Sequence, residues 1–303
     1  MSVANKIMSI HSEKIKVLEK KANEIRIDLM KMLEEAGSGH SAGPLGMADI
    51  FTAFYFHILN HRPREPRWEK GDRLILSNGH IVPIRYVTMH HAGYDITKDE
   101  LMTLRKINSR LEGHPNIHRI PALETTSGPL GEGLSQACGM AMARRFRKQE
   151  HEYTIYCFMS DGEQQEGMIW EAAMFAGKQK FDNFVCLIDR NNIQIDGFTE
   201  DVMPIEPLRE KYEAFGWHVM EMNAHNIAEI VSTVEEAKAV HQKPVLIIAH
   251  TIPGKGVDFM EDDYRWHGVP PGAGPEDDVK KKEQLKEALK DLRTLGGKIE
   301  HGE

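Results

Sequence analysis

The chain has 303 residues, of which 41% are apolar, so it can bury the core of one large domain or two ordinary ones. Its 38 basic and 46 acidic residues give a formal charge of −8 at pH 7. This balance argues against a nucleic-acid partner, because binding to phosphates needs a basic face. No apolar run has the length of a membrane span, and the first residues do not resemble a secretory signal.

From residue 15 to residue 36, apolar side chains recur every three or four positions, which predicts an amphipathic helix ended by Gly37. A second apolar helix is expected over residues 47–59, and a short strand over 73–77. The spacing that begins at Thr97 is that of a capping box, so another helix should start there.

The rest of the chain alternates apolar strands with helices. Strands are predicted over 153–159, 183–189, 217–222 and 244–251, and helices up to about residue 178, over 207–216 and over 226–240. This alternation favours an α/β fold, with a mostly parallel sheet covered by helices on both faces. Ligands of such sheets bind at the carboxyl ends of the strands, so the loops that follow the strands are candidate sites.

Three cysteines, Cys138, Cys157 and Cys186, stand among apolar residues without the spacing of a metal site. This favours free, buried thiols over a redox role. Because reducing compartments keep thiols free, we expect a cytoplasmic protein.

The last segment, residues 276–303, is predicted to be a charged helix with little apolar surface. It is either a solvated terminal helix or an element that docks onto another chain. We expect it to follow a single domain over residues 1–275.

The most acidic loop starts at Asp161, directly after a predicted strand, and Asn191 and Asn192 follow the next strand. If these two strands are neighbours, the Asp161 carboxylate meets an asparagine amide oxygen at the sheet edge. Together with a backbone carbonyl they form half of the oxygen shell that Mg²⁺ takes, and the phosphates of a ligand complete it. The alternative is a polar turn in which Asp161 only caps the next helix.

Gly162 would let a diphosphate approach the backbone, and a helix that opens near Glu166 would point its N–H groups at the anion. The two polar side chains between them, Glu163 and Gln164, are expected to face solvent.

Sixteen histidines are present, and most histidines in proteins lie on the surface. Four of them stand next to glycine in short motifs: His40, His80, His114 and His267. Imidazoles titrate near physiological pH, which suits them to proton transfer.

These motifs resemble the transketolase family. The SDG of residues 160–162 followed by the NN of 191–192 is similar to its thiamine diphosphate motif. Five more motifs stand in the family's order: SGHSAGPLGMAD (38–49), LSNGH (76–80), EGHPN (112–116), TTSGPLGEGLSQACGMA (125–141) and RWHG (265–268). The resemblance implies the thiamine diphosphate-binding fold and a transferase that moves a two-carbon ketol unit from a ketose (phosphate) to an aldose (phosphate).

The resemblance also implies roles for individual residues. The metal, Mg²⁺ or Ca²⁺, would be held by Asp161, Asn191 and the main-chain carbonyl of Ile193. Proton transfer and acceptor contact fall to His40 and His267, and His114 would lie near the terminal hydroxyl of the donor. Contacts with the cofactor are implied for His80, Gly128, Leu130, Asp161, Gly162, Glu166 and Asn191.

Two of these assignments compete with ordinary structural roles. The segment 127–133, with Gly128 and Leu130, also reads as a plain loop–helix junction. Glu166 would link two active sites across a subunit interface, or it is only a first-turn carboxylate favoured by the helix dipole.

A transketolase has three domains, and this chain resembles only the first. The second carries a glutamate that protonates the aminopyrimidine ring of the cofactor. The resemblance therefore implies the N-terminal subunit of a split transketolase, completed by a separate C-terminal subunit in an α2β2 assembly, with sugar phosphates as substrates.

Two departures from the family pattern leave the sugar open. The family's usual glycine before Asp161 is Ser160, and residues 40–43 read HSAG where the family usually has GHPG. The alternatives are another thiamine diphosphate enzyme subunit, either 1-deoxyxylulose-5-phosphate synthase-like or 2-oxo acid decarboxylating, and a non-catalytic cofactor-binding subunit.

Overall fold

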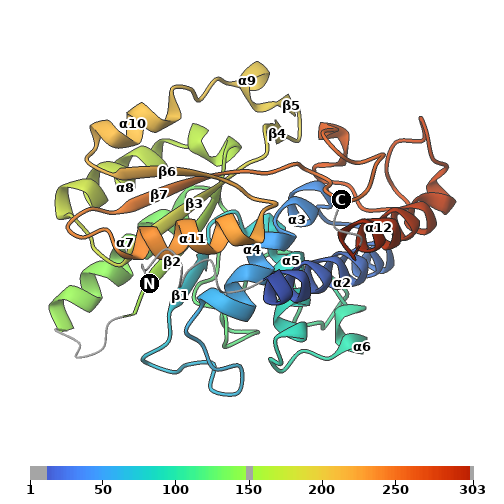
Figure 1. Cartoon of the computed structure of the whole chain (residues 1–303), viewed down its shortest axis with the longest axis horizontal. Helices are drawn as coiled ribbons and strands as arrows, with labels where there is room; N and C mark the ends of the chain where they lie inside the picture. Colours follow the sequence, from blue (N-terminus) through green and yellow to red (C-terminus); the bar gives the residue numbers. More distant parts are fainter. Residues whose placement is uncertain (1–11, 148–152, 301–303) are drawn as a thin grey trace.

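The centre of the molecule is a five-stranded sheet (Figure 1). The computed structural model describes residues 12–147 and 153–300. In spatial order the strands are β1 (Arg73–Leu76), β2 (Ile155–Ser160), β3 (Phe184–Arg190), β7 (Val245–His250) and β6 (His218–Asn223). Every neighbouring pair is parallel, which confirms the predicted sheet.

Helices cover both faces of the sheet, as predicted. One layer contains α2 (Ser12–Ala36), α3 (Ala42–Gly46), α4 (Ala48–Ala53), α5 (Val82–His91), α11 (Ile227–Lys238) and α12 (Gln284–Glu300). The other layer contains α7 (Glu132–Arg147), α8 (Gly167–Gln179) and α10 (Leu208–Ala214). Successive side chains of β2 alternate between the two cores: Phe158 packs in the first and Cys157 in the second.

Most predicted elements lie within a few residues of the observed ones. Gly37 has a φ of +62° and ends α2 as predicted. The helix predicted over 47–59 is α4 followed by a π-helical turn, Phe54–Ile58. Thr97 accepts a hydrogen bond from the Glu100 amide at 3.1 Å, but the helix it caps, α6 (Lys98–Leu101), is only one turn long.

The structure also contains short elements that were not predicted. They are the antiparallel pair β4 (Ile193–Gln194) and β5 (Gly197–Phe198), the single turn α9 (Thr199–Val202), and four 3₁₀ turns at Gly79–Ile81, Gly162–Gln165, Tyr264–Trp266 and Lys281–Glu283. The helices α3 and α5 were not predicted either.

The C-terminal helix α12 lies along α2 (Figure 1). Ala288 and Leu292 are fully buried, and the Asn23 amide donates to the Leu292 carbonyl at 2.7 Å. The helix predicted for the tail is therefore present, but one of its faces is packed on the chain's own core instead of being solvated.

The three cysteines are free and buried, as predicted. None of the helices in residues 12–147 and 153–300 is long and apolar enough to cross a membrane.

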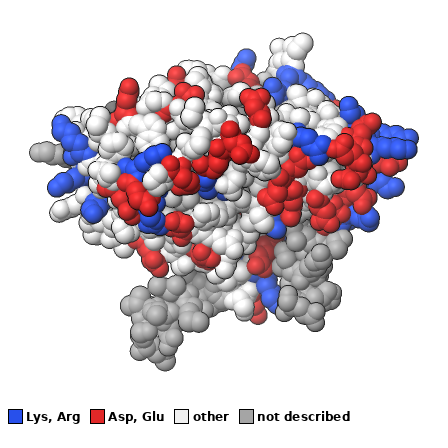
Figure 2. Space-filling view, turned by 90° about the horizontal axis from the view of Figure 1, so that it is seen from above, with Lys and Arg blue, Asp and Glu red and all other residues white. Residues whose placement is uncertain are grey.

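Figure 2 shows acidic side chains across the middle of one face and basic ones mainly towards its two ends. This face therefore has no continuous basic stripe of the kind that follows a phosphate backbone.

Candidate active site

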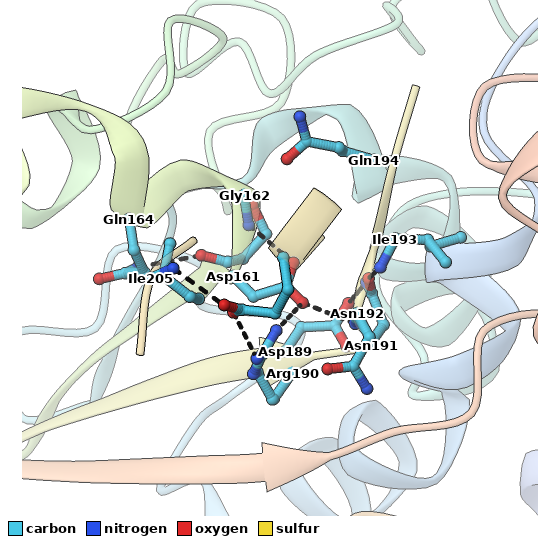
Figure 3. A network of polar contacts seen from close by, with 12 residues as sticks. Asp161, Gly162, Gln164, Asp189, Arg190, Asn191, Asn192, Ile193, Gln194 and Ile205 are labelled. Atoms are coloured by element: carbon cyan, nitrogen blue, oxygen red, sulfur yellow. Dashed lines mark hydrogen bonds and ion pairs between the residues drawn. The ribbon is translucent and has the colours of Figure 1, made fainter. Parts of the chain in front are cut away.

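Asp161 and the turn that carries Asn191 and Asn192 lie next to each other at the carboxyl edge of the sheet, because their strands are neighbours. Ser160 at the end of β2 is paired with Asp189 in β3. The buried Asp161 carboxylate accepts hydrogen bonds from the Gly162 amide at 2.7 Å and from the Asn192 amide at 2.6 Å. Figure 3 shows the carboxylate facing the turn that carries the two asparagines. The adjacency on which the metal-site prediction depends is therefore present.

Arg190, which sequence reasoning missed, is the cationic partner of Asp161. Its Nη1 atom lies 3.2 Å from the Asp161 carboxylate, and its Nη2 atom lies 2.9 Å from Glu200 and 3.0 Å from Glu206 (Figure 3). Burial raises the pKa of Asp161, and the guanidinium charge opposes that rise. The only signal in the sequence was an arginine at the very end of a buried strand.

Asn191 is held in one orientation by its neighbours. Its amide nitrogen donates to Asp189 at 3.0 Å, and its amide oxygen accepts from the Ile193 backbone N–H at 3.0 Å. The Thr251 hydroxyl donates to the other oxygen of Asp189. Burial, together with the nearby charge of Asp161, raises the pKa of Asp189 to about 7, although the hydrogen bonds from Thr251 and Asn191 oppose the rise.

The donor set of this edge fits a hard divalent cation. The carboxylate of Asp161, the amide oxygen of Asn191 and the carbonyl of Ile193 are the oxygen types that Mg²⁺ and Ca²⁺ prefer. In the described part of the chain no three His, Cys, Asp or Glu side chains come together to hold a metal ion. Asp161 would therefore be its only charged protein ligand, and the remaining oxygens would come from a bound ligand.

Gly162 leaves space beside that carboxylate. A Cβ atom at this position would come within 3.1 Å of Gln194 Oε1, so a side chain here would crowd the edge. Ser160, the departure from the family motif, is buried, and its carbonyl accepts from the Gln164 amide at 2.9 Å.

Three of the four motif histidines form one cluster. The ring centroids are 4.7 Å apart for His40 and His80, 5.3 Å for His40 and His267, and 5.5 Å for His80 and His267. They come from three separate segments: the loop before α3, the turn after β1 and the position that directly follows the turn Tyr264–Trp266. The Ser41 hydroxyl donates to the Val269 carbonyl at 2.7 Å, which ties the His40 segment to the His267 segment.

His114 lies on a neighbouring loop against the glycine-rich segment. A Cβ atom on Gly128 would lie 3.6 Å from the His114 ring, so this pair is in close contact. Leu130 is half-buried in the same segment.

The clustered histidines are neutral at physiological pH. Burial lowers the pKa of His40 to about 3 and that of His267 to about 4, and it lowers the pKa of His80 well below its usual value. Burial also lowers the pKa of His114, and the charge of Arg105 lowers it further. A neutral imidazole accepts a proton on one nitrogen and donates one from the other, as exchange with a sugar hydroxyl requires.

Buried polar atoms without partners lie in and beside this cluster. Both side-chain polar atoms of the fully buried Asn78 lack a hydrogen bond, and so does Nδ1 of His267. Because each such group costs about 1–3 kcal/mol, the pocket is suited to a polar ligand or to ordered water.

The prediction that Glu163 and Gln164 face solvent is wrong. Both are buried, because the chain forms a 3₁₀ turn after Asp161 and directs these side chains back into the protein. Gln164 accepts from the Tyr212 hydroxyl at 2.7 Å, whereas Glu166 is exposed and lies beside the glycine-rich turn at Gly131.

The family description "Transketolase, thiamine diphosphate binding domain" matches residues 17–289. The chain belongs to the transketolase family. It is 40% identical, over 94% of its length and 97% of the relative's, to an apulose-4-phosphate transketolase subunit of Phocaeicola vulgatus. It is also 40% identical to 6-deoxy-6-sulfo-D-fructose transketolase subunit SqwG of a Clostridium species, over 83% of this chain and 90% of that one.

The chain spans less than half the length of other transketolases that it matches. The chain resembles the Campylobacter jejuni transketolase structure with a TM-score of 0.81 and 33% identity, over 95% of its own length and 48% of that chain. It likewise spans 40% of human transketolase, at 37% identity. The predicted fold, the family and the assignment to an N-terminal subunit of a split transketolase, a transferase, are confirmed by these comparisons.

Proposed function

We propose that this chain binds thiamine diphosphate and Mg²⁺ and transfers a two-carbon ketol unit once a C-terminal subunit has joined it. The observation that carries the proposal is the cluster of neutral His40, His80 and His267 rings, whose centroids lie within 5.5 Å of one another. In the same chain, Asp161 lies next to the turn of Asn191 and Asn192 at the sheet edge. One site thus combines a cation-binding edge with groups that exchange protons at sugar hydroxyls.

The metal-binding edge would hold the diphosphate end of the cofactor. Asp161, Asn191 and the carbonyl of Ile193 would bind Mg²⁺ or Ca²⁺, and Gly162 would leave room for the phosphates. The cofactor, when bound, supplies the electron sink that lets a carbon–carbon bond next to a ketose carbonyl break.

The histidines would handle the substrate. His40 and His267 would remove and return the proton of the C3 hydroxyl, since a neutral imidazole accepts a proton as a base and the imidazolium so formed gives it back as an acid. His114 would hydrogen-bond the terminal hydroxyl of the donor, and His80 would lie between the diphosphate and the substrate channel. Gly128 and Leu130 would pack against the cofactor, and Glu166 would reach a second active site across the subunit interface.

The substrates would be ketoses and aldoses, most simply as phosphates. The names of the two relatives that are transketolase subunits contain different ketoses, apulose 4-phosphate and 6-deoxy-6-sulfo-D-fructose, and both carry an anionic group. The four positioned histidines favour hydroxyl chemistry of this kind over decarboxylation of a 2-oxo acid.

The partner would be a C-terminal subunit that supplies the missing domains, in an assembly of two copies of each chain. Nearly full coverage of a relative that is itself one subunit of a transketolase supports this arrangement. The free, buried thiols support a cytoplasmic location.

The test is cleavage of a donor ketose with thiamine diphosphate and Mg²⁺, by this chain alone and by its mixture with the candidate C-terminal subunit. We expect activity in the mixture only. An inactive mixture that has assembled and bound the cofactor would favour the non-catalytic alternative.

A further inference from the structure

Glu163 is a fully buried carboxylate to which the proposed chemistry gives no role. Within residues 12–147 and 153–300 no basic side chain forms an ion pair with it. Since a buried charge without a counter-ion is costly, this carboxylate depends on hydrogen bonds.

Three donors surround the Glu163 carboxylate. The Gly131 amide donates to Oε1 at 2.7 Å, the Ser160 amide donates to Oε2 at 3.0 Å, and the Ser77 hydroxyl donates to Oε1. Only an acceptor with two oxygens satisfies this set, and an ionised carboxylate is the strongest such acceptor among side chains.

The three donors come from three segments that border the active site. Ser77 follows β1 and leads into the turn that carries His80. Gly131 belongs to the glycine-rich turn, and Ser160 is the last residue of β2, directly before Asp161. Distant parts of the sequence therefore meet at one side chain.

The backbone of the glycine-rich turn next to Glu163 is tightly packed and has little room to move. Gly131 has a φ of +91°, and a Cβ atom on it would come within 2.6 Å of the Met168 side chain. A Cβ atom on Gly133 would come within 2.4 Å of Ser77. The glycine-rich turn is thus pressed against Ser77 on one side and Met168 on the other, and the carboxylate fixes its amide between them.

We propose that Glu163 is a positioning residue: through its three hydrogen bonds it holds the glycine-rich turn and Asp161 in the geometry that binds thiamine diphosphate and Mg²⁺. This inference rests on the proposed function of the site. Glu163 itself touches neither the metal ligands nor the histidine cluster, and it acts through Ser160 and Gly131.

The first measurement needs no cofactor. Glu163→Gln keeps the size of the side chain but replaces one acceptor oxygen by an NH₂ group, which cannot accept a hydrogen bond. We expect faster amide hydrogen exchange in residues 128–133 and 159–162 of the full chain, with β7 unchanged. Glu236→Gln, which alters an exposed carboxylate on α11, is the matched control.

The second measurement is cofactor affinity in the two-chain mixture. For Glu163→Gln we expect the Kd of thiamine diphosphate, at fixed Mg²⁺, to rise about tenfold, which is the loss of one charge-assisted hydrogen bond. At saturating cofactor kcat should change little, because no group that contacts the substrate has been altered. Should Glu163→Gln fail to fold, Ser77→Ala removes one donor only and should produce smaller changes in the same two quantities.

The outcomes separate this inference from the proposed function. Unchanged exchange in both segments would overturn the positioning role, and so would faster exchange with an unchanged Kd. Wild-type protein that binds no thiamine diphosphate would overturn the proposed function itself, whatever the exchange data show.

Discussion

The side chain on which the account depends most is Asp161. In Asp161→Ala the proposed metal site loses its only charged ligand, so we expect cofactor binding that depends on Mg²⁺ to disappear. Arg190 keeps its pairs with Glu200 and Glu206, so the variant should still fold. Calorimetric titration with thiamine diphosphate and Mg²⁺ checks this, with the exposed Asp99→Ala as the control. Wild-type affinity in Asp161→Ala would contradict the site.

His114 is expected to act on the substrate and not on the cofactor. His114→Ala should bind thiamine diphosphate normally but cleave the donor about 100-fold more slowly, the lower range for loss of a positioned catalytic group. Single-turnover kinetics of the two-chain mixture measures the effect. His118→Ala, an exposed histidine of the same loop, should behave as wild type. A wild-type rate in His114→Ala would remove this residue from the mechanism.

The buried histidines also predict how stability depends on pH. The pKa of His40 is about 3 in the folded chain against 6.5 when unperturbed, so between these values the unfolded state binds the extra proton. The contribution of neutral His40 to the free energy of unfolding is therefore fully present above pH 6.5. It is lost as the pH falls, and the loss is about 2 kcal/mol at pH 5.

His40→Asn lacks this contribution, so its free energy of unfolding should fall by about 2 kcal/mol less than that of the wild type between pH 7.5 and pH 5. Urea unfolding followed by circular dichroism at several pH values measures the difference. Parallel curves for the two proteins would contradict the neutral state of His40.

The sequence predicted those site residues whose positions follow from neighbouring strands. It missed those whose positions depend on how the chain and its side chains turn at the end of a strand. Asp161 lies next to the turn of Asn191 and Asn192 because parallel neighbours end at one edge. The burial of Glu163 depends on a 3₁₀ turn that no pattern announced, and the contact of Arg190 with Asp161 depends on the direction of a side chain at the end of its strand.

At the scale of elements, α12 belongs to the chain's own core. Leu292 is fully buried against α2, so Leu292→Ala should lower the free energy of unfolding by about 2–5 kcal/mol. Lys286→Ala, at an exposed position of the same helix, should change it by less than about 0.5 kcal/mol. Equal stability of the two variants would show that the helix is solvated, as one sequence-based interpretation had it.

Long apolar patterns predicted the elements well, and short ones did not. The helix α2 was predicted because its apolar residues recur every three or four positions, and the central strands were predicted because each is a continuous apolar run. The pair β4 and β5 has only two residues in each strand, too few to form a pattern. The helix α12 was predicted, but its apolar positions are few, and only the tertiary structure shows that they pack on α2.

At the scale of the whole molecule, the chain is one part of a larger enzyme. It spans 48% of the Campylobacter jejuni transketolase but 97% of the Phocaeicola vulgatus relative, which is itself a transketolase subunit. The order of motifs was enough to predict this division, because these motifs resemble only the first domain of a transketolase. The donor sugar did not follow from the sequence, since Ser160 and the residues beside His40 depart from the family pattern.

The most direct measurement follows the two-carbon unit itself. A donor ketose labelled with ¹³C at C1 and C2 is incubated with an unlabelled aldose, thiamine diphosphate, Mg²⁺, this chain and the C-terminal subunit, and the products are examined by NMR. The account predicts that both labels appear together at C1 and C2 of a new ketose, and only when both chains are present. Labelled carbon dioxide, or an unchanged donor in an assembled complex that has bound the cofactor, would contradict it.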